Sequence, residues 1–185
     1  MSELKKRLDG LKALMQESSF LEGKGLSNEV NIRIFCYEPS DEMIIRHFIE
    51  QVRKDTTMKC NIKEYNLYEV FLSICEDKRI INKIPPMEEK KGKEFIREQM
   101  ARMANNMAFV NKMKYEPHEK NDVIIITGVG DAFPFIRVHD LLNAMQPEFP
   151  DLPILVFYPG NYDGRDVQLF NRLNKNSYYR AFKVI

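Results

Sequence analysis

Residues that could carry chemistry gather in ITGVGDAFPFIRVHDLL, residues 126–142, where an apolar run meets two glycines and then Arg, His and Asp. Phosphate binding is one candidate. A phosphate loop needs the spacing GxxxxGK[ST], and a dinucleotide fingerprint needs a third glycine, whereas GVGDAF supplies only Gly128 and Gly130. The end of the first predicted strand, CYEPSDE (36–42), has no Gly or Lys and carries three acids, which would repel phosphate. We therefore expect no nucleotide cofactor.

Hydrolytic or metal chemistry is the second candidate. The chain has no GxSxG motif, and its His and Cys residues form no HExxH or CxxC pattern. Loop carboxylates could still converge on a divalent cation. A metal-dependent nuclease or phosphoesterase built on Asp131, His139, Asp140 and Asp163 is therefore kept as an alternative. The main expectation is a protein with no catalytic residues and no bound metal.

The same stretch also has a purely structural interpretation. Pro134 would occupy the first turn of a helix, and Gly128 and Gly130 would supply unusual dihedral angles or a close approach. His139, at the border of the buried side, would most often hydrogen-bond a neighbouring loop, with partner contact and catalysis left open. We interpret the stretch as a strand-to-helix junction that locks the edge of the sheet.

The segment YPGNYDG, residues 158–164, is similarly ambiguous. Pro-Gly and Asp-Gly form turns, while its two tyrosines offer an aromatic, hydrogen-bonding surface. Tyr178, Tyr179 and Arg180 follow, and aromatic residues with Arg are typical of interaction hot spots. They are equally typical of buried residues with a polar tip, so both interpretations stay open.

Hydrophobic periodicity predicts the elements that position these residues. In the first half, the pattern predicts an opening helix over 1–22, strands over 31–39 and 59–66, a helix capped by Ser40, and another from Leu67. The Pro-Pro sequence within 79–95 is the expected soft spot. A long helix should then bury a stripe that consists of Ile96, Met100, Met103, Met107 and Val110, mainly in the core.

In the second half, DVIIITGVG (122–130) and LPILVFYPG (152–160) predict buried strands, VQLFNRL (167–173) a short helix, and SYYRAFKVI (177–185) a final strand. Strand and helix alternate, so the predicted fold is α/β: a three-layer, mostly parallel sheet with helices on both faces. It would be a Rossmann-like or P-loop-like core without a phosphate loop. Its ligands would sit beyond the carboxyl ends of the strands, where the polar loops lie.

Composition bounds the remaining possibilities. With 185 residues, 44% hydrophobic and 30% charged, the chain predicts one domain over 1–185. The net charge of +1 and the three scattered cysteines indicate no general nucleic-acid or membrane binding and suit a reducing, cytoplasmic compartment. A DNA-binding surface at EEKKGKEFIRE (88–98) is a further alternative, although its interleaved acids are typical of a solvated helix face.

The C-terminal third resembles the BrxB family of bacteriophage exclusion (BREX) defence systems. The resemblance rests on a Gly-x-Gly strand end, Pro-Phe-x-Arg-x-His, FYPGNYDG and a terminal YYRAF, in that order over roughly 122–183. It implies a cytoplasmic component of a prokaryotic phage-defence locus that also encodes an adenine-specific DNA methyltransferase, a large ATPase and a PglZ-type protein of alkaline-phosphatase-like fold. The family has no established catalytic activity.

The resemblance also implies a set of motif residues. They are Gly128, Gly130, Pro134, Arg137, His139, Pro159, Gly160, Tyr162, Tyr179 and Arg180. The hypothesis that follows is a non-enzymatic adaptor that docks on the PglZ-type protein through its polar loop edge, with Arg137, Tyr162 and Tyr179 as candidate contacts. Direct DNA contact is not expected.

Overall fold

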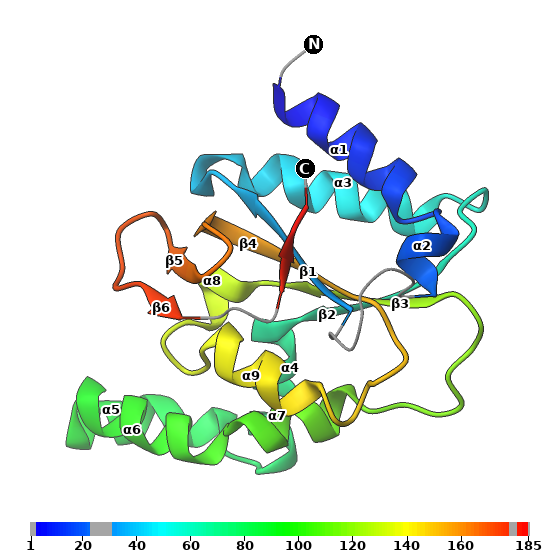
Figure 1. The fold of residues 1–185 in the computed structure, drawn as a ribbon. Coiled ribbons are helices and arrows are strands. Elements are labelled where there is room, and N and C mark those ends of the chain that lie inside the picture. The colour runs from blue at the N-terminus through cyan, green and yellow to red at the C-terminus, as the bar shows by residue number, and fades with distance from the viewer. Residues whose placement is uncertain (1–2, 23–30, 178–180, 185) are drawn as a thin grey trace.

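Parallel strands form the centre of the molecule in a computed structural model that describes residues 3–22, 31–177 and 181–184 (Figure 1). The strand order is β2-β3-β4-β1-β7, and each adjacent pair is parallel. The strands are β1 (Ile32–Tyr37), β2 (Asn61–Asn66), β3 (Asp122–Thr127), β4 (Ile154–Tyr162) and β7 (Phe182–Lys183). The first four predicted strands of the central sheet are therefore confirmed, whereas the final one, predicted over 177–185, is confirmed only at β7 within the described residues.

The sheet as a whole is mixed, because β4 continues into an antiparallel extension. β5 (Asp166–Leu169) pairs with the end of β4, and β6 (Asn176–Ser177) pairs with β5. The helix predicted over 167–173 is therefore wrong. Val167 and Leu169 are buried, whereas Asp166 and Gln168 are partly exposed. Burial of every second residue is typical of a strand.

Helices cover both faces of the sheet. On one face, α1 (Glu3–Leu14), α2 (Ser18–Leu21) and α3 (Glu42–Lys54) pack against a core that includes Phe35 and Phe157. On the other, α4 (Leu67–Asp77), α6 (Lys93–Met103), α7 (Asn106–Met113), α8 (Val129–Ala132) and α9 (Val138–Met145) pack against a core that includes Ile34 and Val156. Because successive side chains of a strand point to opposite faces, the apolar run in each central strand supplies both cores. The three-layer arrangement is confirmed.

The first two helices depart from the predicted bounds. The opening helix is interrupted between α1 and α2, although Leu8 and Leu11 are buried as its pattern requires. Ser40 does not cap α3, because Pro39–Asp41 forms a 3₁₀ turn and Asp41 occupies the capping position. The helix thus begins one residue later than its polar residues indicated.

The region with two prolines is a helix, which corrects the soft-spot prediction. Pro85 and Pro86 lie in the first turn of α5 (Ile84–Lys91), where a missing N–H costs little. The long helix expected next is broken between α6 and α7, because Asn105 caps α7 by accepting from the Ala108 backbone N–H. Ile96, Met100 and Val110 are buried as predicted, but Met107 is 45% exposed, so the predicted core stripe is wrong at that position.

The three cysteines are buried free thiols, and burial raises the pKa of Cys36 to about 11. Within the described ranges, no helix is long and apolar enough to cross a lipid bilayer.

Candidate functional site

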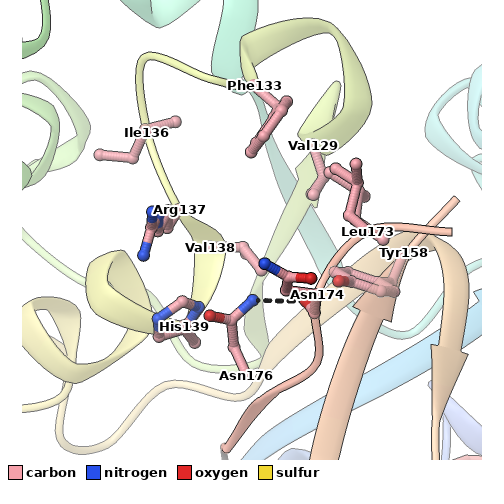
Figure 2. Close-up of a pocket in the computed structure, with 11 residues that line it drawn as sticks. Val129, Phe133, Ile136, Arg137, Val138, His139, Tyr158, Leu173, Asn174 and Asn176 are labelled. Atoms are coloured by element: carbon pink, nitrogen blue, oxygen red, sulfur yellow. Dashed lines mark hydrogen bonds between the residues drawn. The ribbon is translucent and has the colours of Figure 1, made fainter.

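The two motif segments meet at a cavity of about 200 Å³ beyond the carboxyl ends of β3 and β4 (Figure 2). The first wall is formed by α8, by the start of α9 and by the link between these two helices. The second wall is formed by β4, by β5 and by the chain that follows β5. Apolar side chains form most of the lining: Val129, Phe133, Ile136, Val138, Leu169 and Leu173. Segments separated by some 30 residues therefore build one concave surface.

Three motif glycines allow close approaches of the chain around the cavity. Gly128 has φ +67°, in the left-handed region, and a Cβ there would lie 2.3 Å from Oδ1 of Asn66. A Cβ on Gly130 would lie 2.8 Å from the Phe170 ring, and one on Gly160 would lie 2.2 Å from the Gln168 carbonyl oxygen. The predicted role in dihedral angles and close approach is confirmed. These residues shape the site and contribute no chemistry to it.

Pro134 does not open a helix, contrary to the prediction. α8 ends at Ala132, α9 begins at Val138, and Pro134 lies exposed in the link between them after a cis peptide bond. Arg137 takes the capping position of α9 with an extended backbone. The link, rather than a helix face, therefore delivers the polar groups of the motif to the cavity.

Arg137 and His139 lie on the α9 side of the cavity, while Asn174 and Asn176 face them from the chain after β5 (Figure 2). Arg137 is exposed, and no carboxylate of the described residues pairs with it. The Asn176 amide donates to the Asn174 carbonyl oxygen at 3.0 Å. Among the described residues, the rim thus carries one unpaired cation, Arg137, and neutral polar groups.

His139 is mostly enclosed, its side chain being 15% exposed. Its Nε2 lies 3.3 Å from Oδ1 of Asp140, so its polar neighbour is the next residue in the chain instead of the expected loop. The pKa of His139 is lowered overall. Burial has the largest effect and lowers it, the Asp140 carboxylate raises it, and the Arg137 guanidinium lowers it. The imidazole is therefore neutral at pH 7.

Tyr158 lines the cavity from β4 and is only 2% exposed. Within the described part of the chain its hydroxyl has no hydrogen-bond partner. Burial, and secondarily the neighbouring Cys36, raises the pKa of Tyr158, so the hydroxyl keeps its proton. A buried hydroxyl at a cavity wall can bond a ligand that enters.

Tyr162 is fully buried, which makes it unsuitable as the docking contact that we expected from the sequence. Its hydroxyl donates to the Ala181 carbonyl at 2.7 Å and lies 3.1 Å from that of Gly164. Pro159 and Gly160 are buried as well. These motif residues hold the β4–β5 hairpin against the end of the chain. The other predicted contacts, Tyr179 and Arg180, lie outside the described residues.

The acids of the metal-site alternative occupy separate environments. Oδ2 of Asp131 lies 2.6 Å from the Arg46 guanidinium. Asp163 accepts the backbone N–H groups of Asp166 and Arg165, which lower its pKa. Throughout the described ranges, no three His, Cys, Asp or Glu side chains are grouped so that they could hold a metal ion.

A second depression, of about 220 Å³, lies on the α3 side of the strand ends. Two ion pairs lie in it: Arg46 lies 2.8 Å from Glu42, and Arg53 lies 2.6 Å from Glu64. Glu42 also accepts the hydroxyl of Tyr37, and burial together with this bond raises the pKa of that tyrosine. These pairs join α3 to the sheet, whereas Glu69 of the same lining has no ion pair among the described residues.

The candidate DNA-binding segment, residues 88–98, covers the end of α5 and the start of α6. Arg97 lies 2.9 Å from Glu94, so part of its positive charge is neutralised locally. Sequence reasoning offered Tyr158 only as one of the two tyrosines of YPGNYDG, and it missed Asn174 and Asn176 as cavity residues. The only signal for these two asparagines was their position just before the YYRAF motif.

Comparison with known proteins gives a consistent result. The family model described as BREX protein BrxB matches residues 63–184. A BREX protein BrxB of Bacillus cereus (strain H3081.97) is 37% identical over 192 residues, which covers 100% of this chain and 99% of the relative. A BREX protein BrxB of Escherichia coli O9:H4 (strain HS) is 27% identical over 187 residues, which covers 98% of this chain and 92% of the relative. No solved structure matches the chain.

Proposed function

The chain belongs to the BREX protein BrxB family and is a component of a BREX phage-defence system, and we propose that it serves there as a non-enzymatic adaptor. Its partner in this proposal is the PglZ-type protein of alkaline-phosphatase-like fold, with other BREX components attached through it. The interaction takes place in the cytoplasm.

One observation carries the proposal: both family-motif segments meet at a single cavity with an unpaired Arg137 on its rim. Phe133, which is 37% exposed, lines the same cavity. An arginine next to exposed aromatic surface is typical of interaction hot spots. A concave apolar patch edged by polar groups is also typical of a site for a protein partner.

The end of β1 supports a role without nucleotide chemistry. There the chain forms a 3₁₀ turn over Pro39–Asp41 and carries Glu38, Asp41 and Glu42 in place of a glycine-rich loop. Carboxylates at this position disfavour a phosphate ligand. We therefore regard the sheet as a Rossmann-like or P-loop-like core that has no phosphate loop.

Co-purification tests the proposal. The tagged chain, co-expressed with the other proteins of a BREX locus, should retain the PglZ-type protein through size-exclusion chromatography. The rim variant Phe133→Glu/Arg137→Glu should lose it, because it inserts two negative charges beside the cavity. The same variant should also lose protection in a phage plaque assay.

A matched control has the same change of charge on another surface. Met107 and Arg102 are an exposed apolar residue and an exposed arginine on α7 and α6. Met107→Glu/Arg102→Glu should leave the complex intact. Absence of a complex with the wild-type chain would rule out the adaptor role. Equal loss with both double variants would rule out the cavity rim as the specific docking surface.

A further inference from the structure

We propose that the cavity beside α9 binds a short peptide segment in which a carboxylate neighbours an apolar side chain. The carboxylate would pair with Arg137, and the apolar side chain would enter the cavity beside Tyr158. This inference rests on the adaptor function and specifies what the partner must present.

The charge of the lining favours an anionic group. Arg137 and His139 are the basic residues there, and among the described residues that line the cavity none is Asp or Glu. Arg137 has no carboxylate partner in the described part of the chain. No side chain caps the first turn of α9, so its N-terminal N–H groups add to the positive potential. A carboxylate would satisfy the guanidinium without displacing an existing ion pair.

Tyr158 provides a second and independent indication of a ligand. Its side chain is 2% exposed, yet its hydroxyl has no partner among the described residues. Figure 2 shows the oxygen end of Tyr158 directed toward Asn174, on the inner side of the cavity. The hydroxyl oxygen is not among the fully enclosed atoms without a partner, so it meets the cavity and is free to bond a ligand that enters. A peptide carbonyl or carboxylate oxygen would accept from this hydroxyl.

The apolar lining and the volume of the cavity indicate what else the ligand must contain. Val129, Ile136, Leu169 and Leu173 enclose a volume of about 200 Å³. Pockets for small molecules and cofactors usually measure about 300–1,000 Å³, so the cavity suits one inserted side chain better than a cofactor. An apolar residue next to the acidic one would fill this space.

A nucleic acid fits these observations less well. Phosphate-backbone binding uses several Lys and Arg residues in a row, whereas Arg137 and His139 are the basic groups lining the cavity, and His139 is held neutral by burial. A single arginine above an apolar pocket matches one carboxylate with an apolar neighbour. The acidic peptide is therefore the occupant that the structure favours.

The first experiment measures binding of the full-length chain to the purified PglZ-type protein. Arg137→Ala should raise Kd roughly tenfold, as for a hot-spot residue. Tyr158→Phe removes only a hydroxyl and should raise Kd about twofold to tenfold, the value of one hydrogen bond. Leu173→Trp should also weaken binding, because the larger side chain fills the cavity. The matched control is Arg165→Ala, an exposed arginine outside the lining.

The second experiment needs no partner protein. The isotope-labelled full-length chain is titrated with acetyl-Leu-Glu-amide at millimolar concentration and followed by NMR. The side-chain signals of Arg137 and His139 should shift more than with acetyl-Leu-Gln-amide, which lacks the charge, or acetyl-Ala-Glu-amide, which lacks the apolar side chain. The shift of the His139 signals should disappear in Arg137→Ala.

The two experiments separate the proposals. If the partner binds the wild-type chain and all cavity variants equally, the adaptor function stands and the peptide site is wrong. If no partner binds but the dipeptide shifts are selective, the peptide site stands and the choice of partner is wrong. Equal shifts with the neutral dipeptide or with inorganic phosphate alone, or no shifts, would overturn the proposed ligand.

Discussion

A Cβ on Gly128 would lie 2.3 Å from Oδ1 of Asn66, the atom that caps α4 by accepting the backbone N–H groups of Tyr68 and Glu69. The glycine after β3 therefore makes room for the helix cap after β2. Because β2 and β3 are adjacent strands, this contact sets the spacing between their two loops. The motif glycine is thus explained by geometry at the entrance of the site.

Gly128→Ala should lower the free energy of unfolding by about 3 kcal/mol, since left-handed backbone and overpacking each cost about 1–3 kcal/mol. The control is Gly164→Ala, which has φ +95° but nothing within 4 Å of the added Cβ. It should lose only about 1 kcal/mol from backbone strain. Urea denaturation checks both values, and equal losses would show that the Asn66 contact contributes nothing.

Tyr162→Phe should reduce stability by about 1–3 kcal/mol, because it removes the donor to the buried Ala181 carbonyl. Tyr158→Phe is the matched control: it removes a hydroxyl without a partner in the described residues and should change stability by less than about 0.5 kcal/mol. Thermal unfolding of both variants checks the difference. A stable Tyr162→Phe protein that fails to bind the partner would contradict the structural role of this tyrosine.

The pair Arg46–Asp131 joins α3 on one face of the sheet to α8 on the other, at 2.6 Å. Both side chains are nearly half exposed, so a double-mutant cycle with Arg46→Ala and Asp131→Ala should give a coupling of about 0.2–1 kcal/mol. The coupling should fall further in 1 M NaCl, because salt screens exposed charges. A salt-independent coupling of several kcal/mol would mean that this pair is shielded from solvent.

The stability of the chain should decrease on acidification through His139. Burial lowers the pKa of the folded-state imidazole, while Asp140 and Arg137 oppose each other. Below the unfolded pKa of about 6.5, the unfolded state therefore binds more protons than the folded state. The contribution of neutral His139 to the stability of the folded protein is fully present above about pH 6.5. It is lost as the pH falls through the lower pKa of the folded state.

The measurement is the free energy of unfolding of the wild type and His139→Gln between pH 7.5 and 5.5. The free energy of unfolding of the wild type minus that of His139→Gln should decrease toward low pH, because histidine titrates in this range and glutamine does not. A difference that stays constant or grows would mean that the folded protein favours the protonated imidazole. Comparing the two proteins cancels the contributions of the other titrating groups.

Much of the fold was predictable because a strand that is covered on both faces of the sheet has an uninterrupted run of apolar residues. The run Val123–Ile126 could only be an interior strand, since each of its residues needs cover. VQLFNRL was not predictable in this way. Its apolar residues fit a short helix or a strand, and pairing with Gly160–Tyr162 decided in favour of the strand.

The candidate site shows the same division. The sequence by itself determined the strand ends, the glycines that shape them and the presence of Arg137 and His139 in one motif. Tertiary structure alone decided that Tyr158 faces the cavity while Tyr162 is buried against Ala181, and that Asp131 pairs with Arg46. The physical reason is that periodicity records whether a side chain is covered, whereas its partners come from segments far away in the chain.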